Sequence, residues 1–110
     1  MIPNRIYNIQ TQAEIKAQGG AVAFCAIGQP QQFYNFAKKF YDLKETISFE
    51  DHYKYTQYDM YHLVEIAKKY QVYTLITTQK DEAKITNLIK DIKDFNFNVL
   101  ELRNEITALE

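Results

Sequence analysis

Apolar residues form an unbroken run over 21–27, AVAFCAI, which ends at the turn residues Gly28-Gln29-Pro30. A short apolar run with such a boundary is typical of a parallel strand that is covered on both faces. After the run, apolar residues recur three and four positions apart, as one face of a helix requires, at Phe33, Phe36, Ala37 and Phe40. The pattern therefore predicts a buried strand, a turn and a helix that begins at the proline.

The same order of strand, loop and helix occurs twice more. Residues 46–49 and 72–77 are short and rich in residue types that favour strands. Each is followed by a polar stretch and then by the apolar face of a helix. The first face contains Met60, Leu63, Val64 and Ala67, and the second contains Ile85, Leu88, Ile89 and Ile92. Thr56 is the expected N-cap of the first of these helices.

Two more strands are expected at the ends of the chain, over 5–10 and 97–102, with a helical stretch over 12–18. Strands that alternate with helices imply right-handed βαβ units. The predicted fold is one α/β domain, with a mostly parallel sheet of about four to five strands and helices on both faces. Residues 1–20 are interpreted as an amino-terminal strand or arm with its connector, and residues 21–110 as the α/β domain.

Composition and charge narrow the classes of function. A chain of 110 residues with 46% hydrophobic and 25% charged residues is expected to form one soluble core. The formal net charge is −1, with basic and acidic residues scattered, so no nucleic acid partner is expected. The longest apolar run is far shorter than the roughly 20 residues of a membrane helix, and the first residues lack a signal peptide's features. We expect a cytoplasmic protein without a transmembrane segment, whose single Cys25 is buried and inert.

The candidate chemistry lies in three polar loops, each of which follows a predicted strand. They are Gly28-Gln29-Pro30, Asp51-His52-Tyr53 and Thr77-Thr78-Gln79-Lys80-Asp81. Because ligands of open parallel sheets bind beyond the carboxyl ends of the strands, a candidate site is expected where these loops meet. It would bring a histidine, a lysine and two carboxylates together.

Each candidate residue has two interpretations. His52 is either a proton shuttle or a turn histidine satisfied by the backbone. Asp51 is expected to cap its loop, since adjacent side chains in extended backbone point to opposite sides. Lys80 either neutralises a phosphate near a helix start or pairs with a nearby carboxylate such as Asp81. Gly28 permits a tight turn or a close backbone approach.

Several motifs are absent from the 110 residues. There is no G-x-x-x-x-G-K-[ST] and no G-x-G-x-x-G, so neither a P-loop nor the glycine-rich loop of dinucleotide-binding folds is predicted. No nucleophile accompanies His52 in an identifiable motif. The two histidines lack the H-x-x-x-H spacing, so no metal site is predicted. The predicted site is therefore half of an active site.

Three stretches resemble the carboxyl-terminal domain of tetraacyldisaccharide 4′-kinases, enzymes of lipid A biosynthesis, in order and spacing over residues 21–86. They are AVAFCAIGQPQQFYNF, SFEDHYKYTQYDM and LITTQKDEAKI. The family pattern is A-G-I-G-x-P-x-x-F, then D-H-x-x-[YF]-[TS], then T-T-E-K-D-x-x-K. The matching residues are Asp51, His52, Tyr55, Thr56, Thr77, Thr78, Lys80, Asp81 and Lys84. The chain departs from the pattern at Cys25-Ala26, at Gln32 and Gln79, where arginine and glutamate are usual, and at Glu50, where proline is common.

The resemblance implies transfer of the γ-phosphoryl group of ATP to the 4′-hydroxyl of a lipid A disaccharide precursor. In the family, a preceding P-loop domain binds MgATP and supplies an acidic base, which the D-H histidine assists across the cleft. That catalytic role falls to His52. Substrate or loop positioning falls to Asp51, Gly28, Thr77, Thr78, Lys80 and Asp81. ATP and Mg²⁺ are thus implied for the complete enzyme, and no cofactor for this chain alone.

The resemblance also implies partners and a location. The partners are a P-loop domain from the same gene or a split gene, and the lipid A precursor. The location is the cytoplasmic face of the inner membrane of a Gram-negative bacterium, with peripheral attachment through the P-loop domain. Without a P-loop, the chain is expected to be inactive alone. The alternative is a noncatalytic binding module that retains the fold; an independent small hydrolase has no identifiable nucleophile or metal set.

Overall fold

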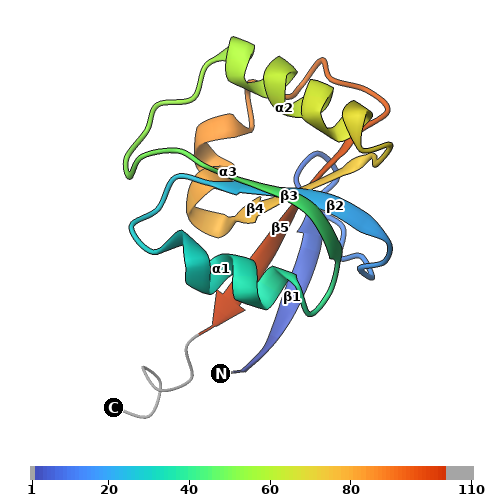
Figure 1. Cartoon of the computed structure of the whole chain (residues 1–110), viewed down its shortest axis with the longest axis vertical. Coiled ribbons are helices and arrows are strands. Elements are labelled where there is room, and N and C mark those ends of the chain that lie inside the picture. The colour runs from blue at the N-terminus through green and yellow to red at the C-terminus, as the bar shows by residue number, and fades with distance from the viewer. Residues whose placement is uncertain (1, 104–110) are drawn as a thin grey trace.

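The computed structural model describes residues 2–103, within which five strands and three helices form a layered α/β structure (Figure 1). The elements in chain order are β1 (Ile2–Asn8), β2 (Gly20–Cys25), α1 (Pro30–Ala37), β3 (Asp42–Ser48), α2 (Gln57–Lys69), β4 (Thr74–Thr78), α3 (Gln79–Ile85) and β5 (Asn96–Arg103). The strand order is β1-β5-β4-β2-β3, and the sheet is parallel except where β1 pairs with β5. The predicted fold class is confirmed.

Helices cover both faces of the sheet. One hydrophobic cluster joins Ala23 of β2 to Phe33 of α1, and the other joins Phe24 of β2 to Leu63 of α2 and Ile85 of α3. Figure 1 shows α1 and α2 on opposite sides of the strands. All residues over 21–26 are buried, so the predicted coverage of this strand on both faces is confirmed. Cys25 is a buried free thiol whose pKa is raised by burial.

Helix α2 begins as the sequence predicts. Thr56 Oγ1 accepts a hydrogen bond from the backbone N–H of Asp59 at 3.2 Å, and Asp59 Oδ2 accepts one from the N–H of Thr56 at 2.8 Å. This reciprocal capping box satisfies two N–H groups at the helix start. The expected apolar face, Met60, Leu63, Val64 and Ala67, is buried.

The predicted helix over 12–18 is wrong. This segment folds back on β1: the N–H of Asn8 donates to the carbonyl of Ala13 at 3.0 Å, and the N–H of Ile15 donates to that of Ile6 at 2.8 Å. Gln12 has a φ of 60°, which an α-helix does not allow. Bonds to a neighbouring strand have replaced the bonds that a short helix would make within itself.

The third predicted helix is shorter than its apolar pattern. Helix α3 ends at Ile85, and the segment beyond it continues as turns, in which the N–H of Leu88 donates to the carbonyl of Ile85 at 2.8 Å. Thr86 Oγ1 also binds the carbonyl of Glu82 at 2.7 Å, a local side-chain bond of the kind that competes with helix continuation. Ile89 and Ile92 are still buried, so the pattern identified inward-facing residues but not their geometry.

The amino-terminal strand lies at one edge of the sheet. β1 contributes Ile6 and Tyr7 to the buried core, and its antiparallel partner is β5. No helix within residues 2–103 combines the length and apolar character that a membrane crossing requires.

Candidate functional site

Three loops meet at the carboxyl ends of β4, β2 and β3, which lie side by side in the sheet. The backbone N–H of Ala26, after β2, donates to Asp81 Oδ1 of α3 at 3.1 Å. A Cβ atom on Gly28 would lie 3.4 Å from Asp51 Oδ2, so the loops after β2 and β3 touch. Lys84 Nζ of α3 donates to the carbonyl of Tyr53 at 3.4 Å. The sequence therefore predicts correctly that the three loops converge.

Asp81 holds this edge of the sheet together from the inside. Its side chain is fully buried and accepts hydrogen bonds from Ala26 N–H and Tyr55 Oη, both at 3.1 Å, and from Thr78 Oγ1 at 2.5 Å. All three donors are neutral. The negative charge also lies in the first turn of α3, where the helix dipole favours an anion. Asp81 thus links the loop after β2, the segment before α2 and the start of α3.

The threonines at the end of β4 also form hydrogen bonds inside the protein. Thr77 is fully buried, and its Oγ1 donates to the carbonyl of Phe24 at 2.8 Å. Thr78 is the N-cap of α3, because its Oγ1 accepts a hydrogen bond from the N–H of Asp81 at 3.1 Å. Both side chains position backbone at the edge of the sheet.

His52 lies on the surface of the same edge, in a turn over residues 50–53 that the N–H of Tyr53 closes by donating to Glu50 at 3.0 Å. Its φ of 68° is in the left-handed region, which is uncommon for residues other than glycine. The side chain is 84% exposed, and Nε2 lies 3.7 Å from Asp51 Oδ2. In extended backbone the side chains of Asp51 and His52 would point to opposite sides. The left-handed conformation of His52 is compatible with their contact. His52 is therefore open to a second protein part or a ligand.

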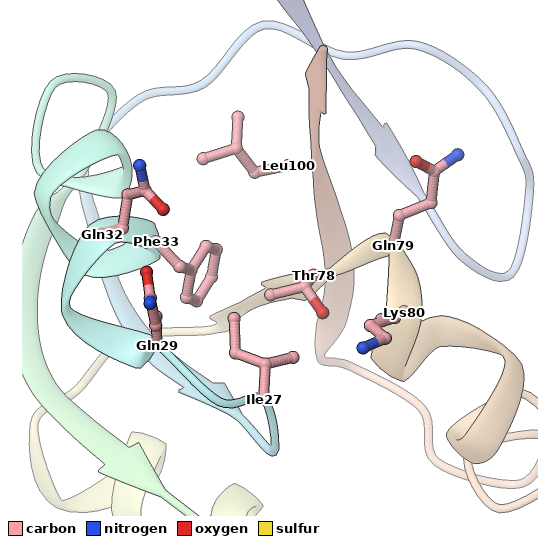
Figure 2. Close-up of a pocket in the computed structure, with 8 residues that line it drawn as sticks. All are labelled: Ile27, Gln29, Gln32, Phe33, Thr78, Gln79, Lys80 and Leu100. Carbon is pink, nitrogen blue, oxygen red and sulfur yellow. The ribbon is translucent and has the colours of Figure 1, made fainter. Parts of the chain in front are cut away.

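A first cavity, here called the amide cavity, lies between the starts of α1 and α3 and measures about 330 Å³. Its lining residues are Ile27, Gln29, Gln32, Phe33, Thr78, Gln79, Lys80 and Leu100. Figure 2 shows Gln29 and Gln32 on the α1 side and Lys80 on the α3 side of the apolar Ile27 and Phe33. The mixture provides amide donors and acceptors around an apolar floor, with one cation.

Lys80 does not pair with the carboxylates nearest to it in sequence. Asp81 points inward, and Glu82 binds Tyr7 Oη at 2.5 Å and Gln12 Nε2 at 2.9 Å. The interpretation of Lys80 as a partner of Asp81 is therefore wrong, and its ammonium group lines the amide cavity.

A second cavity, here called the His52 groove, lies between the loop after β3 and α3 and measures about 530 Å³. Its lining residues are His52, Tyr53, Lys54, Tyr55, Lys84, Asn87 and Leu88. The predicted site residues are thus divided: His52 lines one cavity, while Thr78 and Lys80 line the other. Lys54, Asn87 and Leu88 are not among the predicted site residues, because the apolar spacing assigns Leu88 to the face of a continuing helix and the other two carry no motif signal.

The family model of Tetraacyldisaccharide-1-P 4′-kinase matches residues 1–110. The chain belongs to this family. It is 33% identical over 88 residues to the tetraacyldisaccharide 4′-kinase of Halothermothrix orenii, which covers 78% of this chain and 23% of that relative. It is 38% identical over 89 residues to that of Rickettsia akari, covering 76% of this chain and 27% of the relative.

The chain spans about a quarter of the length of the curated relatives it matches; for the kinase of Rickettsia canadensis, 38% identical over 71 residues, the share is 22%. No solved structure matches the chain.

Among residues 2–103, no three His, Cys, Asp or Glu side chains gather closely enough to hold a metal ion.

Proposed function

We propose that this chain supplies the carboxyl-terminal, substrate-side part of a tetraacyldisaccharide 4′-kinase, with residues 21–110 as the counterpart of that domain. The observation that carries the proposal is the family match over the whole chain. The complete enzyme transfers the γ-phosphoryl group of ATP to the 4′-hydroxyl of a lipid A disaccharide precursor. The exposed His52, at an edge where three loops converge, supports a catalytic role that needs a second part.

In the proposed reaction, the 4′-hydroxyl oxygen attacks the γ-phosphorus, and the bond from this phosphorus to the oxygen that bridges to the β-phosphate breaks, so that ADP leaves. The hydroxyl proton passes to a carboxylate supplied by the P-loop part. His52 pairs with that carboxylate across the cleft, which raises the basicity of the imidazole and positions the carboxylate toward the hydroxyl. Asp51, 3.7 Å from Nε2 of His52, helps to hold the imidazole and its loop.

ATP and Mg²⁺ are assigned to the P-loop part. The chain alone is then inactive, and its partners are the P-loop part and the lipid A precursor. The proposed location is the cytoplasmic face of the inner membrane of a Gram-negative bacterium, with peripheral attachment to the membrane through the P-loop part.

A chimera tests this proposal. The chain replaces the 89 matched residues of the Rickettsia akari kinase, and ATP-dependent phosphorylation of the lipid precursor is measured. The chimera is expected to be active, and His52→Ala to lower its rate roughly 100-fold or more, as for loss of a group that assists proton transfer. The matched control is His62→Ala, which removes the exposed histidine of α2 and should leave the rate unchanged.

The outcomes separate the alternatives. An active chimera that tolerates His52→Ala removes His52 from the mechanism. A folded but inactive chimera contradicts the proposed function and favours a noncatalytic binding module.

A further inference from the structure

Two lysines line the His52 groove, and the carboxylate of Asp51 lies 3.7 Å from Nε2 of His52 but is not among the lining residues. Lys54 and Lys84 line it together with His52, and no Asp or Glu is among its lining residues. Among the residues that the structure describes, Lys84 Nζ donates to the backbone carbonyl of Tyr53, at 3.4 Å. Within residues 2–103, neither lysine forms an ion pair with a carboxylate. Two exposed ammonium groups at one groove fit an anion with several oxygens, such as a phosphate.

The floor of the groove is apolar and held in place. The rings of Tyr53 and Tyr55 meet edge to face at 5.5 Å. Their hydroxyl groups donate to Asp59 Oδ2 at 2.9 Å and Asp81 Oδ1 at 3.1 Å, so carboxylates outside the groove fix both rings. A fixed aromatic floor with a few polar groups at its rim is the usual form of a small-molecule site. Such a floor suits the carbon face of a sugar ring, and the amide of Asn87 suits its hydroxyls.

We propose that the His52 groove binds the phosphate-bearing sugar of the acceptor, with Lys54 and Lys84 on the phosphate. This inference rests on the proposed function, because the family is described as acting on a disaccharide that carries a phosphate at position 1. The groove contains both His52 and the two lysines, so an acceptor hydroxyl at the histidine and a phosphate at the lysines occupy one continuous surface. The amide cavity, with Lys80 as its single lysine, fits an anion less well.

Binding of a sugar phosphate to the 110-residue chain tests the inference directly. The probe is glucosamine 1-phosphate at millimolar concentration, and the readout is the ¹⁵N-¹H NMR spectrum. The expected result is a saturable shift of the amide signals over 52–55 and 84–88. Glucosamine, which lacks the phosphate, should bind at least about tenfold more weakly, since charge-assisted hydrogen bonds are lost. Inorganic phosphate and ADP distinguish a sugar phosphate site from a general phosphate or nucleotide site.

A double variant identifies the phosphate ligands. Lys54→Gln with Lys84→Gln is expected to weaken glucosamine 1-phosphate binding by about tenfold or more while the spectrum elsewhere is kept. The matched control is Lys68→Gln with Lys69→Gln, which removes the same charge from the last turn of α2. In the titration, the inference is overturned if no shifts occur, if the shifts fall on residues of the amide cavity, or if ADP or inorganic phosphate binds equally well. In the comparison of variants, it is overturned if both double variants bind glucosamine 1-phosphate alike.

The two proposals fail separately. A chimeric kinase that depends on His52 but keeps its KM for the lipid in the Lys54→Gln, Lys84→Gln variant overturns only this inference. Lysine-dependent binding of glucosamine 1-phosphate combined with an inactive, folded chimera supports the groove and contradicts the proposed function.

Discussion

Two loops at the same edge of the sheet differ in how their polar side chains are used. At the start of α3, Asp81 has no exposed surface and binds three donors, and Thr77 is equally buried. In the turn over 50–53, the side chain of His52 is 84% exposed, and its Nε2 lies 3.7 Å from Asp51 Oδ2. Both loops match the same family pattern. The polar side chains of one form hydrogen bonds inside the protein, whereas the other exposes an imidazole to solvent.

This difference shows that a match to the family pattern does not distinguish residues that stabilise the fold from residues that are available to a ligand. A buried carboxylate that accepts hydrogen bonds from three donors inside the protein has no exposed surface for a substrate to reach. An exposed histidine with a left-handed backbone conformation contributes little to packing. The measurements below test this contrast, from the largest expected effect to the smallest.

Removing the buried carboxylate is expected to have the largest effect on stability. Asp81→Ala leaves the N–H of Ala26 and the hydroxyls of Tyr55 and Thr78 without their acceptor. The expected loss in the free energy of unfolding is about 4 kcal/mol, because each orphaned buried donor costs about 1 to 3 kcal/mol. Urea denaturation followed by circular dichroism measures it.

The matched substitution in the other loop is Asp51→Ala. Asp51 is 46% exposed on its side chain, and surface pairs of this kind contribute under about 1 kcal/mol. If Asp51→Ala and Asp81→Ala cost the same, the contrast between the two loops is wrong.

Alkaline pH is expected to weaken the buried network through Tyr55. Burial, and next the negative charge of Asp81, raise the pKa of Tyr55 in the folded chain above the value of about 10 for an unfolded tyrosine. Above pH 10 the unfolded state then binds fewer protons than the folded state. The free energy of unfolding therefore falls as pH rises, by about 1 kcal/mol for this residue near pH 11.

Urea denaturation at pH 8 and pH 11 measures this fall. Tyr55→Phe should reduce the difference between the two pH values by about 1 kcal/mol. Tyr58→Phe is the control, since Tyr58 is 76% exposed and its hydroxyl meets water in both states. Equal pH dependence in the two variants would contradict the role given to Tyr55.

The smallest effect is expected at His52 itself. His52→Gly should change the free energy of unfolding by less than about 1 kcal/mol, because glycine accepts a φ of 68° without strain and this offsets its larger loss of chain entropy. His62→Gly, inside α2, should cost about 1 kcal/mol instead. A loss of several kcal/mol for His52→Gly would show that the imidazole holds the fold.

Much of the fold follows from local patterns. The apolar run over 21–27 predicts β2, an inner strand, because helices on both faces of the sheet bury it. Thr56 predicts the start of α2 because its cap uses only neighbouring residues. The predicted helix over 12–18 fails because bonds to β1 decide that segment, and a single stretch of sequence carries no sign of them. The third helix is too long in the prediction because Ile89 and Ile92 can face the core from turns as well as from a helix.

The convergence of the three loops could be predicted from the sequence, but the orientation of their side chains could not. Parallel strands bring the loops together, as the order of elements requires. The sequence gives no sign that Asp81 points inward while Lys80, one residue earlier, points into a cavity. Nor does it show that Lys54 and Lys84, 30 positions apart, line one groove, because their approach depends on how α3 packs beside the turn.

The pairing of β1 with β5 also bears on how the chain reaches its native state. Tyr7 lies opposite Val99, so this edge of the sheet forms only when two segments far apart in the sequence meet. Such distant pairing slows folding, because the chain must lose loop entropy before the contact is made. During synthesis, β1 must wait until β5 has left the ribosome before it finds this neighbour.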